Sequence, residues 1–244
     1  MANSKTAGEV KLRYGLTDAN KIICISELSK ENREKNGDFY CPNCKSPLVA
    51  KMGNKNQRHF AHKNADCNNS SANETALHML AKEILVANMK ITIPAYEISG
   101  EEYYTMAEGP FYDDLGYDVY GELLDNFKYS DALEIKFDEV ISEKKIGEIV
   151  PDILLMVGKK QLIIEIAVTH FVDDEKLDRI KKLNISAIEI NLSAIKNKEL
   201  KREEIENLII TDVKYKTWLH NIKHDKALLN LTERNRDICA KYYM

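Results

Sequence analysis

Apolar residues recur along this chain with two different periods, one typical of helices and one typical of strands. Over residues 74–88 they follow the i, i+3, i+4, i+7, i+8 spacing that places side chains on one face of a helix. These positions are Leu77, Leu80, Ala81, Ile84 and Leu85. We therefore predict a helix over residues 74–88, with an N-cap among three suitable residues just before it. The candidate caps are Ser70, Ser71 and Asn73.

Shorter apolar or alternating stretches predict strands. Residues 149–157 and 161–169 are apolar and flank a tight turn at Gly158 and Lys159, which predicts a hairpin whose strands enter the core. The other predicted strands cover residues 9–14, 21–28, 91–98, 132–142 and 186–192. Predicted helices cover residues 173–183 and 194–208, and residues 213–243 are expected to be largely helical. Strands that alternate with helices after a hairpin indicate a mixed α/β sheet.

Composition and charge narrow the class of protein further. Hydrophobic residues make up 44% and charged residues 30% of the 244 residues, which is ordinary for a globular protein. The chain has only 10 Gly and 5 Pro, and this low content excludes a collagen-like or low-complexity chain. Residues 1–90 hold 14 Lys and Arg against 9 Asp and Glu, a net charge of +5, whereas residues 91–244 hold 21 against 30, a net charge of −9. A basic N-terminal part is thus followed by an acidic remainder.

The acidity is concentrated in residues 97–125, which contain nine acidic residues and no Lys or Arg. This stretch is an irregular, solvated insertion, an acidic surface for a basic partner, or a cover over a nucleic-acid groove, and the sequence leaves these interpretations open. The first ten residues are polar, and no apolar run approaches the ~20 residues of a membrane helix, so we expect a cytoplasmic protein without a membrane segment. In such a reducing compartment, five cysteines favour metal binding or burial over disulfides.

A Cys/His-rich stretch supplies the first candidate chemistry. Cys41 and Cys44 form a CxxC motif, in which a tight turn aims two thiolates at one metal ion. A tetrahedral zinc ion needs two more ligands, and the candidates are His59, His62 and Cys67. We favour His62 and Cys67, with His59 close behind, and expect a structural zinc because four protein ligands leave no open position. Residues 45–63 hold five basic residues and no acidic one, so this zinc ribbon suits contact with phosphates, unless it is only a solvated charged face.

Two carboxylates in the predicted hairpin form a second candidate site. Asp152 and Glu165 are the only acidic residues of the two apolar strands, where a charge is costly unless it is paired or bound to a metal. If the hairpin pairs Val157 with Lys160, Asp152 lies opposite Glu165. A divalent cation would remove the repulsion between two adjacent carboxylates, and oxygen ligands suit Mg²⁺ or Mn²⁺. Such a cation activates a water molecule and stabilises charge on a phosphodiester.

The predicted helix over residues 74–88 offers a third acid. Glu74, His78 and Lys82 stand at i, i+4 and i+8 and form one stripe that borders the apolar face. Glu74 would complete the cation site, and Lys82 would supply positive charge to a phosphate. The simpler interpretation of this stripe is a solvent-facing row of charges, and the spacing alone leaves both open.

Over roughly residues 9–90 and 148–192, several short segments occur in an order that is typical of a known family. In sequence order these segments are CPNC, RHFAH, ETALHMLAKEIL, VPDILL and IIEIAVTH. The chain resembles the CoiA-like competence nuclease family, within the PD-(D/E)XK restriction-endonuclease-like superfamily. The resemblance implies an αβββαβ core, metal-dependent DNA cleavage and a zinc segment ahead of the core. Asp152 matches the Asp of the PD element, Glu165 matches the acidic residue of (D/E)XK, and Glu74 matches the acid of the first core helix.

The chain departs from that pattern at one position. The lysine of (D/E)XK should stand at 167, where this sequence has Ala167. Either a lysine from elsewhere replaces it, such as Lys82 or Lys176 of the following predicted helix, or catalysis is slow, or the site only binds. The sequence therefore predicts a DNA nuclease with Mg²⁺ (or Mn²⁺) at Glu74, Asp152 and Glu165. The alternative is a catalytically degenerate, zinc-containing subunit that binds nucleic acid or docks in a larger assembly.

The expected architecture combines these features. We expect an α/β fold with N-terminal strands and the zinc ribbon in residues 1–70. A restriction-endonuclease-like αβββαβ core is expected in residues 71–210, with the acidic insertion 97–125, and a helical C-terminus in residues 211–244. DNA is the expected partner, and the sequence is also compatible with an oligomer.

Overall fold

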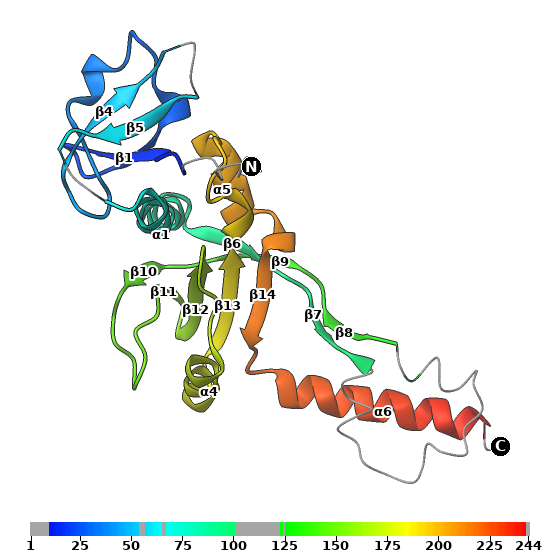
Figure 1. The fold of residues 1–244 in the computed structure, drawn as a ribbon. Coiled ribbons are helices and arrows are strands. Elements are labelled where there is room, and N and C mark those ends of the chain that lie inside the picture. Colours follow the sequence, from blue (N-terminus) through cyan, green and yellow to red (C-terminus); the bar gives the residue numbers. More distant parts are fainter. Residues whose placement is uncertain (1–9, 54–56, 65–66, 101–122, 124, 243–244) are drawn as a thin grey trace, which may run out of the picture.

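The chain forms two five-stranded β-sheets that both pack against one long helix, α1 (Figure 1). The structure is a computed structural model of the 244-residue chain and describes residues 10–53, 57–64, 67–100, 123 and 125–242. The mixed α/β character agrees with the prediction from the sequence. No helix within these described ranges has both the length and the apolar run needed to cross a membrane.

The first sheet is antiparallel, with strand order β2-β1-β3-β4-β5. Its strands are β1 (Tyr14–Thr17), β2 (Ile22–Cys24), β3 (Phe39–Tyr40), β4 (Pro47–Lys51) and β5 (His59–His62), with 3₁₀ turns at Ile25–Glu27 and Glu34–Asn36. The buried ring of Phe60 lies directly under β1, because a Cβ added at Gly15 would be 2.9 Å from that ring. The close approach of backbone to ring therefore requires glycine at this position.

Helix α1 (Asn69–Asn88) begins five residues earlier than the apolar pattern predicts. Asn68 caps it, since its Oδ1 accepts hydrogen bonds from the backbone N of Ser70 (2.8 Å) and of Ser71 (3.3 Å). The prediction of Ser70, Ser71 or Asn73 as the cap was therefore wrong. The first turn is small and polar, so no apolar period marks it, and the cap had to be recognised from its side chain alone.

The second sheet has the strand order β10-β11-β12-β13-β14. Its strands are β10 (Glu139–Ser142), β11 (Ile153–Val157), β12 (Lys160–Ala167), β13 (Ser186–Asn191) and β14 (Lys216–His220). The β11–β12 hairpin pairs Val157 with Lys160, so the predicted register is confirmed. Strand β13 runs parallel to β12 after the crossover helix α4 (Asp174–Leu183), and β10, β11 and β14 pair antiparallel with their neighbours.

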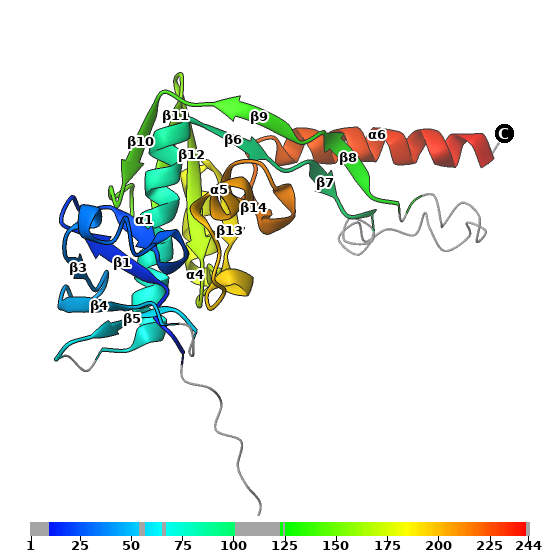
Figure 2. The same ribbon diagram turned by 90° about the horizontal axis from the view of Figure 1, so that it is seen from above.

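Helices cover both faces of this sheet (Figures 1 and 2). α1 and α5 (Arg202–Ile210) pack on one face, where their apolar residues join those of β11, β12 and β13 in the main core cluster. α4 packs on the other face, where Ile180 meets Leu154 and Ile163. Along the chain, α1 is followed by β6 to β9, then by β10, β11 and β12, and then by α4 and β13, which is a mixed α/β arrangement.

A two-stranded ribbon extends from the second sheet toward the C-terminal helix (Figure 2). β6 (Lys90–Ile93) pairs with β9 (Leu133–Lys136), and β7 (Tyr96–Ile98) pairs with β8 (Phe127–Ser130). The predicted strand 91–98 is thus divided around Pro94, which has no N–H to contribute to a ladder. The predicted strand 132–142 is likewise divided, into β9 and β10. Most of the acidic insertion 97–125 lies outside the described residues, so its role stays a prediction.

The C-terminal part differs from the sequence-based expectation. Helix α6 (His224–Tyr242) confirms a helical C-terminus, but residues 216–220 form β14 at the edge of the second sheet. The predicted helix 194–208 is confirmed only in its second half, where residues 202–208 belong to α5, whereas its start forms a 3₁₀ turn at Ser193–Ile195. Strand β14 is held by tertiary contacts: Trp218 Nε1 donates to the carbonyl oxygens of Pro94 and Ala95, both at 3.2 Å.

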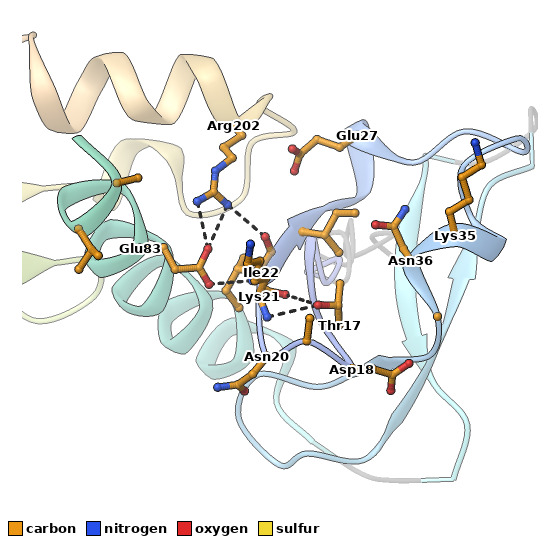
Figure 3. A pocket seen from close by; sticks show the side chains of 15 residues that line it. Thr17, Asp18, Asn20, Lys21, Ile22, Glu27, Lys35, Asn36, Glu83 and Arg202 are labelled. Atoms are coloured by element: carbon orange, nitrogen blue, oxygen red, sulfur yellow. Dashed lines mark hydrogen bonds and ion pairs between the residues drawn. The ribbon is translucent and has the colours of Figure 1, made fainter. Parts of the chain in front are cut away.

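One ion pair ties the first sheet to helices α1 and α5 at a cavity of about 960 Å³ (Figure 3). Arg202 of α5 donates from both of its terminal nitrogens to Glu83 Oε2 of α1, each at 3.1 Å. Ile22 of β2 joins this pair through its backbone: its N donates to Glu83 Oε1 at 2.9 Å, and its O accepts from Arg202 at 3.3 Å. These groups satisfy one another's hydrogen bonds, so we interpret this region as a structural junction between the first sheet, α1 and α5.

We expect Arg202→Met to lower the free energy of unfolding by about 1–3 kcal/mol, because Glu83 is left partly buried without its charged partner. The matched control is Lys90→Met, which breaks the more exposed pair with Glu134 and should cost less than about 1 kcal/mol. Urea denaturation of both variants measures the difference. Equal losses would show that the Arg202 pair does not hold the junction.

Candidate functional site

The CxxC motif occupies the turn that joins β3 to β4. Cys41 N donates to Ser46 O at 2.9 Å and Lys45 N donates to Cys41 O at 3.0 Å, so the turn closes on itself. Lys45 adopts a left-handed conformation with φ of 61°, which lets the chain reverse directly after Cys44. The two thiols are thereby presented on one side of the turn.

Two further residues complete a compact Cys/His group. His62 ends β5, and Cys67 immediately precedes the cap of α1. The ligand atoms of Cys41, Cys44, His62 and Cys67 all lie within 4.8 Å of one another. The Sγ atoms of Cys41 and Cys67 are 3.9 Å apart, and Cys44 Sγ is 3.5 Å from His62 Nε2. A tetrahedral zinc with Zn–S bonds near 2.3 Å needs S···S separations of about 3.8 Å, so these four residues fit a zinc ion.

His59 does not belong to this group. It lies three residues before His62 on β5, and because side chains alternate along a strand, the two rings point to opposite faces. His59 Nδ1 is instead 2.9 Å from the backbone oxygen of Gln57. The alternation of a short strand was therefore the signal that could have removed His59 from the five candidate ligands.

The thiols differ in electrostatic environment. Burial raises the pKa of Cys41 to about 12. Burial also raises the pKa of Cys44, but hydrogen bonds from Ser46, Cys41 and Cys67 outweigh it and bring that pKa down to about 6. The lowered pKa favours the thiolate form of Cys44, which is the form that binds metal.

The candidate carboxylates meet in a second place, at the C-terminal end of β12. A small cavity of about 200 Å³ is lined by residues from both sheet faces. Its lining includes the charged or titratable residues Glu74, His78, Asp152, Glu165, Lys176 and Glu189. One pocket is therefore formed by segments that are distant along the chain. They are α1, the residue before β11, and the end of β12 together with the loop and first turn of α4.

Asp152 is held in place by a backbone donor and a histidine. Its Oδ2 accepts a hydrogen bond from Ile166 N at 2.8 Å and lies 3.4 Å from His78 Nδ1. Burial raises the pKa of Asp152, but the hydrogen bond and the charge of His78 outweigh it, so the pKa falls below its usual value. Burial likewise lowers the pKa of His78, and its interactions with Asp152 and Glu74 raise it overall. Each group therefore favours the charged form of the other.

Glu165 is the most buried acid of the pocket, with only 3% of its surface exposed. Burial raises its pKa to about 7, although Lys176 opposes this shift with Nζ 2.7 Å from Glu165 Oε2. Its other oxygen, Oε1, is buried and has no hydrogen-bond partner. A buried carboxylate oxygen without a partner is costly. It is also an oxygen ligand that suits a divalent cation.

Glu74 is anchored from the loop after β12. Its Oε2 accepts a hydrogen bond from Thr169 Oγ1 at 2.8 Å, and its Oε1 lies 3.5 Å from His170 Nδ1. Lys196 Nζ in turn donates to Thr169 Oγ1. Glu74 is thus oriented by residues that the sequence did not single out for this role.

The two candidate lysines lie in different places. Lys82 does not line the pocket, and its Nζ is 4.0 Å from Glu143. Lys176 lines it and bonds Glu165, while Ala167, which replaces the motif lysine, is buried. In the sequence, His78 is marked only by its place in a stripe with Glu74 and Lys82, and no pattern marks Glu189. In the structure Glu189 is paired with Glu165 in the parallel β12–β13 register.

The three proposed Mg²⁺ ligands are less tightly grouped than the thiols. Among the described residues, only the Cys/His group brings three or more ligand atoms within 4.8 Å of one another. In the pocket, Asp152 and Glu165 instead bond His78 and Lys176. A cation would therefore have to draw the carboxylates closer together.

A comparison with known protein families gives a match at the Cys/His group. Residues 25–70 match the family model for the N-terminal domain of the competence protein CoiA. The CoiA match ends at the second residue of α1 and contains all four residues of the Cys/His group. The match covers 46 of the 244 residues and ends before Glu74, the first residue of the chain that lines the carboxylate pocket. No curated protein and no solved structure matches the chain.

We expect the purified protein to contain about one zinc ion per chain. Cys67→Ala should abolish stoichiometric zinc and lower the melting temperature, because zinc binding contributes directly to folding at such sites. His62→Ala and His59→Ala form a matched pair: the first should weaken zinc binding at least about tenfold, and the second should leave it unchanged. Elemental analysis with a chelator competition assay measures both. A loss of zinc in His59→Ala alone would contradict the ligand set.

Proposed function

We propose that this chain is a metal-dependent deoxyribonuclease of the PD-(D/E)XK type, with a separate structural zinc. Glu74, Asp152 and Glu165 would hold Mg²⁺ or Mn²⁺, and Cys41, Cys44, His62 and Cys67 would hold the zinc. The proposed partner is DNA, and the proposed location is the cytoplasm, as the sequence analysis expects. The CoiA match supports the family context of this proposal, and the pocket supports its chemistry.

The observation that carries the proposal is the convergence of acids at one small cavity. Glu74, Asp152 and Glu165 come from positions 78 and 13 residues apart, yet all line the same 200 Å³ space. Glu165 Oε1 is buried there without a partner, which a purely structural carboxylate would rarely tolerate. Oxygen atoms in this arrangement form a donor set for a hard divalent cation.

Lys176 would take the place of the missing motif lysine. Its ammonium lies 2.7 Å from Glu165 Oε2, and it reaches the pocket from the first turn of α4. A lysine beside a catalytic carboxylate can orient a water molecule and stabilise negative charge on a phosphate. The function of the strand lysine would thus be supplied from the neighbouring helix.

The chain's own residues would prepare the site in distinct ways. His78 keeps Asp152 ionised, Thr169 orients Glu74, and Lys176 partly neutralises Glu165. When bound, the cation would activate a water molecule and stabilise the phosphodiester transition state. The zinc would act on the same site indirectly, because its ligand Cys67 immediately precedes the cap of the helix that carries Glu74.

A second function is a catalytically inactive subunit that binds nucleic acid or another protein. The specific observation in its favour is that Asp152 and Glu165 are already paired with His78 and Lys176. Where cationic side chains already pair with these two carboxylates, no metal ion is required to offset their charge. The acidic segment 97–125 would then serve as a docking surface for a basic partner. Cleavage assays distinguish the two functions.

We expect Asp152→Asn and Glu165→Gln to lower Mg²⁺-dependent cleavage of linear and circular DNA at least about 100-fold, since each removes a charge that would bind the cation. Glu139→Gln on β10, outside the pocket, is the matched control and should cut at the wild-type rate. EDTA should abolish cleavage by the wild-type protein. Wild-type rates in either pocket variant, with the fold intact by circular dichroism, would reject the site.

Lys176→Met should slow cleavage about 10- to 100-fold, because it removes the positive charge beside Glu165. Lys82→Met should change the rate less than about twofold, since Lys82 does not line the pocket. Single-turnover rates at saturating Mg²⁺ separate this effect from cation affinity. The reverse order of the two variants would transfer the lysine role to Lys82.

A further inference from the structure

An aromatic residue lies exposed at the rim of the carboxylate pocket. Phe171 follows β12 in the loop that leads to α4, lines the cavity with Glu74 and Glu165, and has 55% of its surface exposed. Single exposed apolar residues are common on protein surfaces and need no explanation by themselves. The position of this one, beside the candidate reaction centre, is what requires a physical account.

The loop that carries Phe171 is fixed at its C-terminal side. Val172 N donates to Glu189 Oε2 at 2.8 Å, and Asp173 caps α4 by accepting from Lys176 N at 2.7 Å. Val172, not Phe171, packs into the apolar cluster under α4 that contains Ile180. The loop therefore already has its apolar anchor, and the ring of Phe171 remains at the surface on a held backbone.

The size of the cavity decides which part of a nucleic acid can enter it. Sites that enclose a small molecule usually measure about 300–1,000 Å³, whereas this cavity is about 200 Å³. A phosphate group with its cation fits such a space, and a whole nucleotide does not. The bases on either side of the bound phosphate must therefore lie at the rim, where Phe171 is.

We propose that Phe171 is a stacking platform for an unpaired base next to the scissile phosphate, so that the pocket takes single-stranded DNA in preference to intact duplex. This inference rests on the proposed nuclease function. Aromatic side chains stack on bases of any sequence, and bases in a duplex are already stacked on their neighbours. The preference would thus be for strand state and not for base sequence.

The test is the affinity of the full-length protein for fluorescent oligonucleotides, measured by anisotropy in Ca²⁺ and in EDTA, with their integrity checked on gels. The probes are a single strand, the blunt duplex of equal length, and an abasic deoxyribose-phosphate strand of equal length. Phe171→Ala and Phe171→Leu should weaken single-strand binding about 5- to 150-fold, and Phe171→Trp should retain it. Leu133→Ala, which removes another exposed apolar side chain on β9, should have no effect.

The abasic strand identifies stacking as the cause. The wild-type protein should bind it more weakly than the normal strand, and Phe171→Ala should bind both equally. The inference is overturned if Phe171→Ala binds as the wild type does, if it still distinguishes the two strands, if duplex is preferred, or if the wild-type protein binds no strand. Failure of the nuclease proposal has a different signature, because loss of metal-dependent cutting would leave these binding differences intact.

Discussion

The burial of α1 between two sheets is the constraint on which both candidate sites depend. The buried side of α1 includes Leu77, Leu80 and Ile84, which pack with the second sheet, and Ala72, which packs with the first. Asn73 is fully buried beside Glu74: it accepts from Arg13 N at 2.9 Å and donates to Lys11 O at 3.0 Å. The helix can therefore neither rotate nor slide without breaking both interfaces.

This constraint fixes the positions of residues at each edge of the helix. Cys67 lies just before the N-cap Asn68, so the Cys/His group is built against the start of α1. Glu74 and His78 follow within about three turns of the cap and line the carboxylate pocket. With a rise of about 1.5 Å per residue, Glu74 lies only about 9 Å along the helix from its cap. Loosening the Cys/His group would thus be transmitted to Glu74 through a single rigid element.

Much of this arrangement could be predicted from the sequence where local patterns and short-range geometry decide. The hairpin register followed from the turn at Gly158, and it places Asp152 next to Glu165. The Cys/His group followed from ligand spacing, except that the alternation of β5 had to exclude His59. These features depend on neighbours within one supersecondary unit, which the sequence specifies directly.

The features that sequence patterns missed depend on tertiary contacts. Strand β14 is short and forms only because β13 offers an edge and Trp218 bonds the chain at Pro94 and Ala95. Lys176 could be suggested as a substitute lysine, but its contact with Glu165 depends on how α4 packs against β12. A cation in the first turn of a helix is disfavoured by the helix dipole, so this lysine needs the compensation that Glu165 provides.

The charge balance of the pocket bears on how a nucleic acid could enter it. Five acidic residues line it, Glu74, Asp152, Glu165, Asp173 and Glu189, against one lysine, Lys176, and two histidines. A phosphodiester would meet net repulsion there, and in a small, partly dehydrated cavity that repulsion is stronger than in water. Binding of a divalent cation would reverse the sign of the local field before a phosphate arrives. Under the proposed function, a cation would therefore bind before DNA. The exposed ring of Phe171 would then offer DNA a contact that carries no charge penalty.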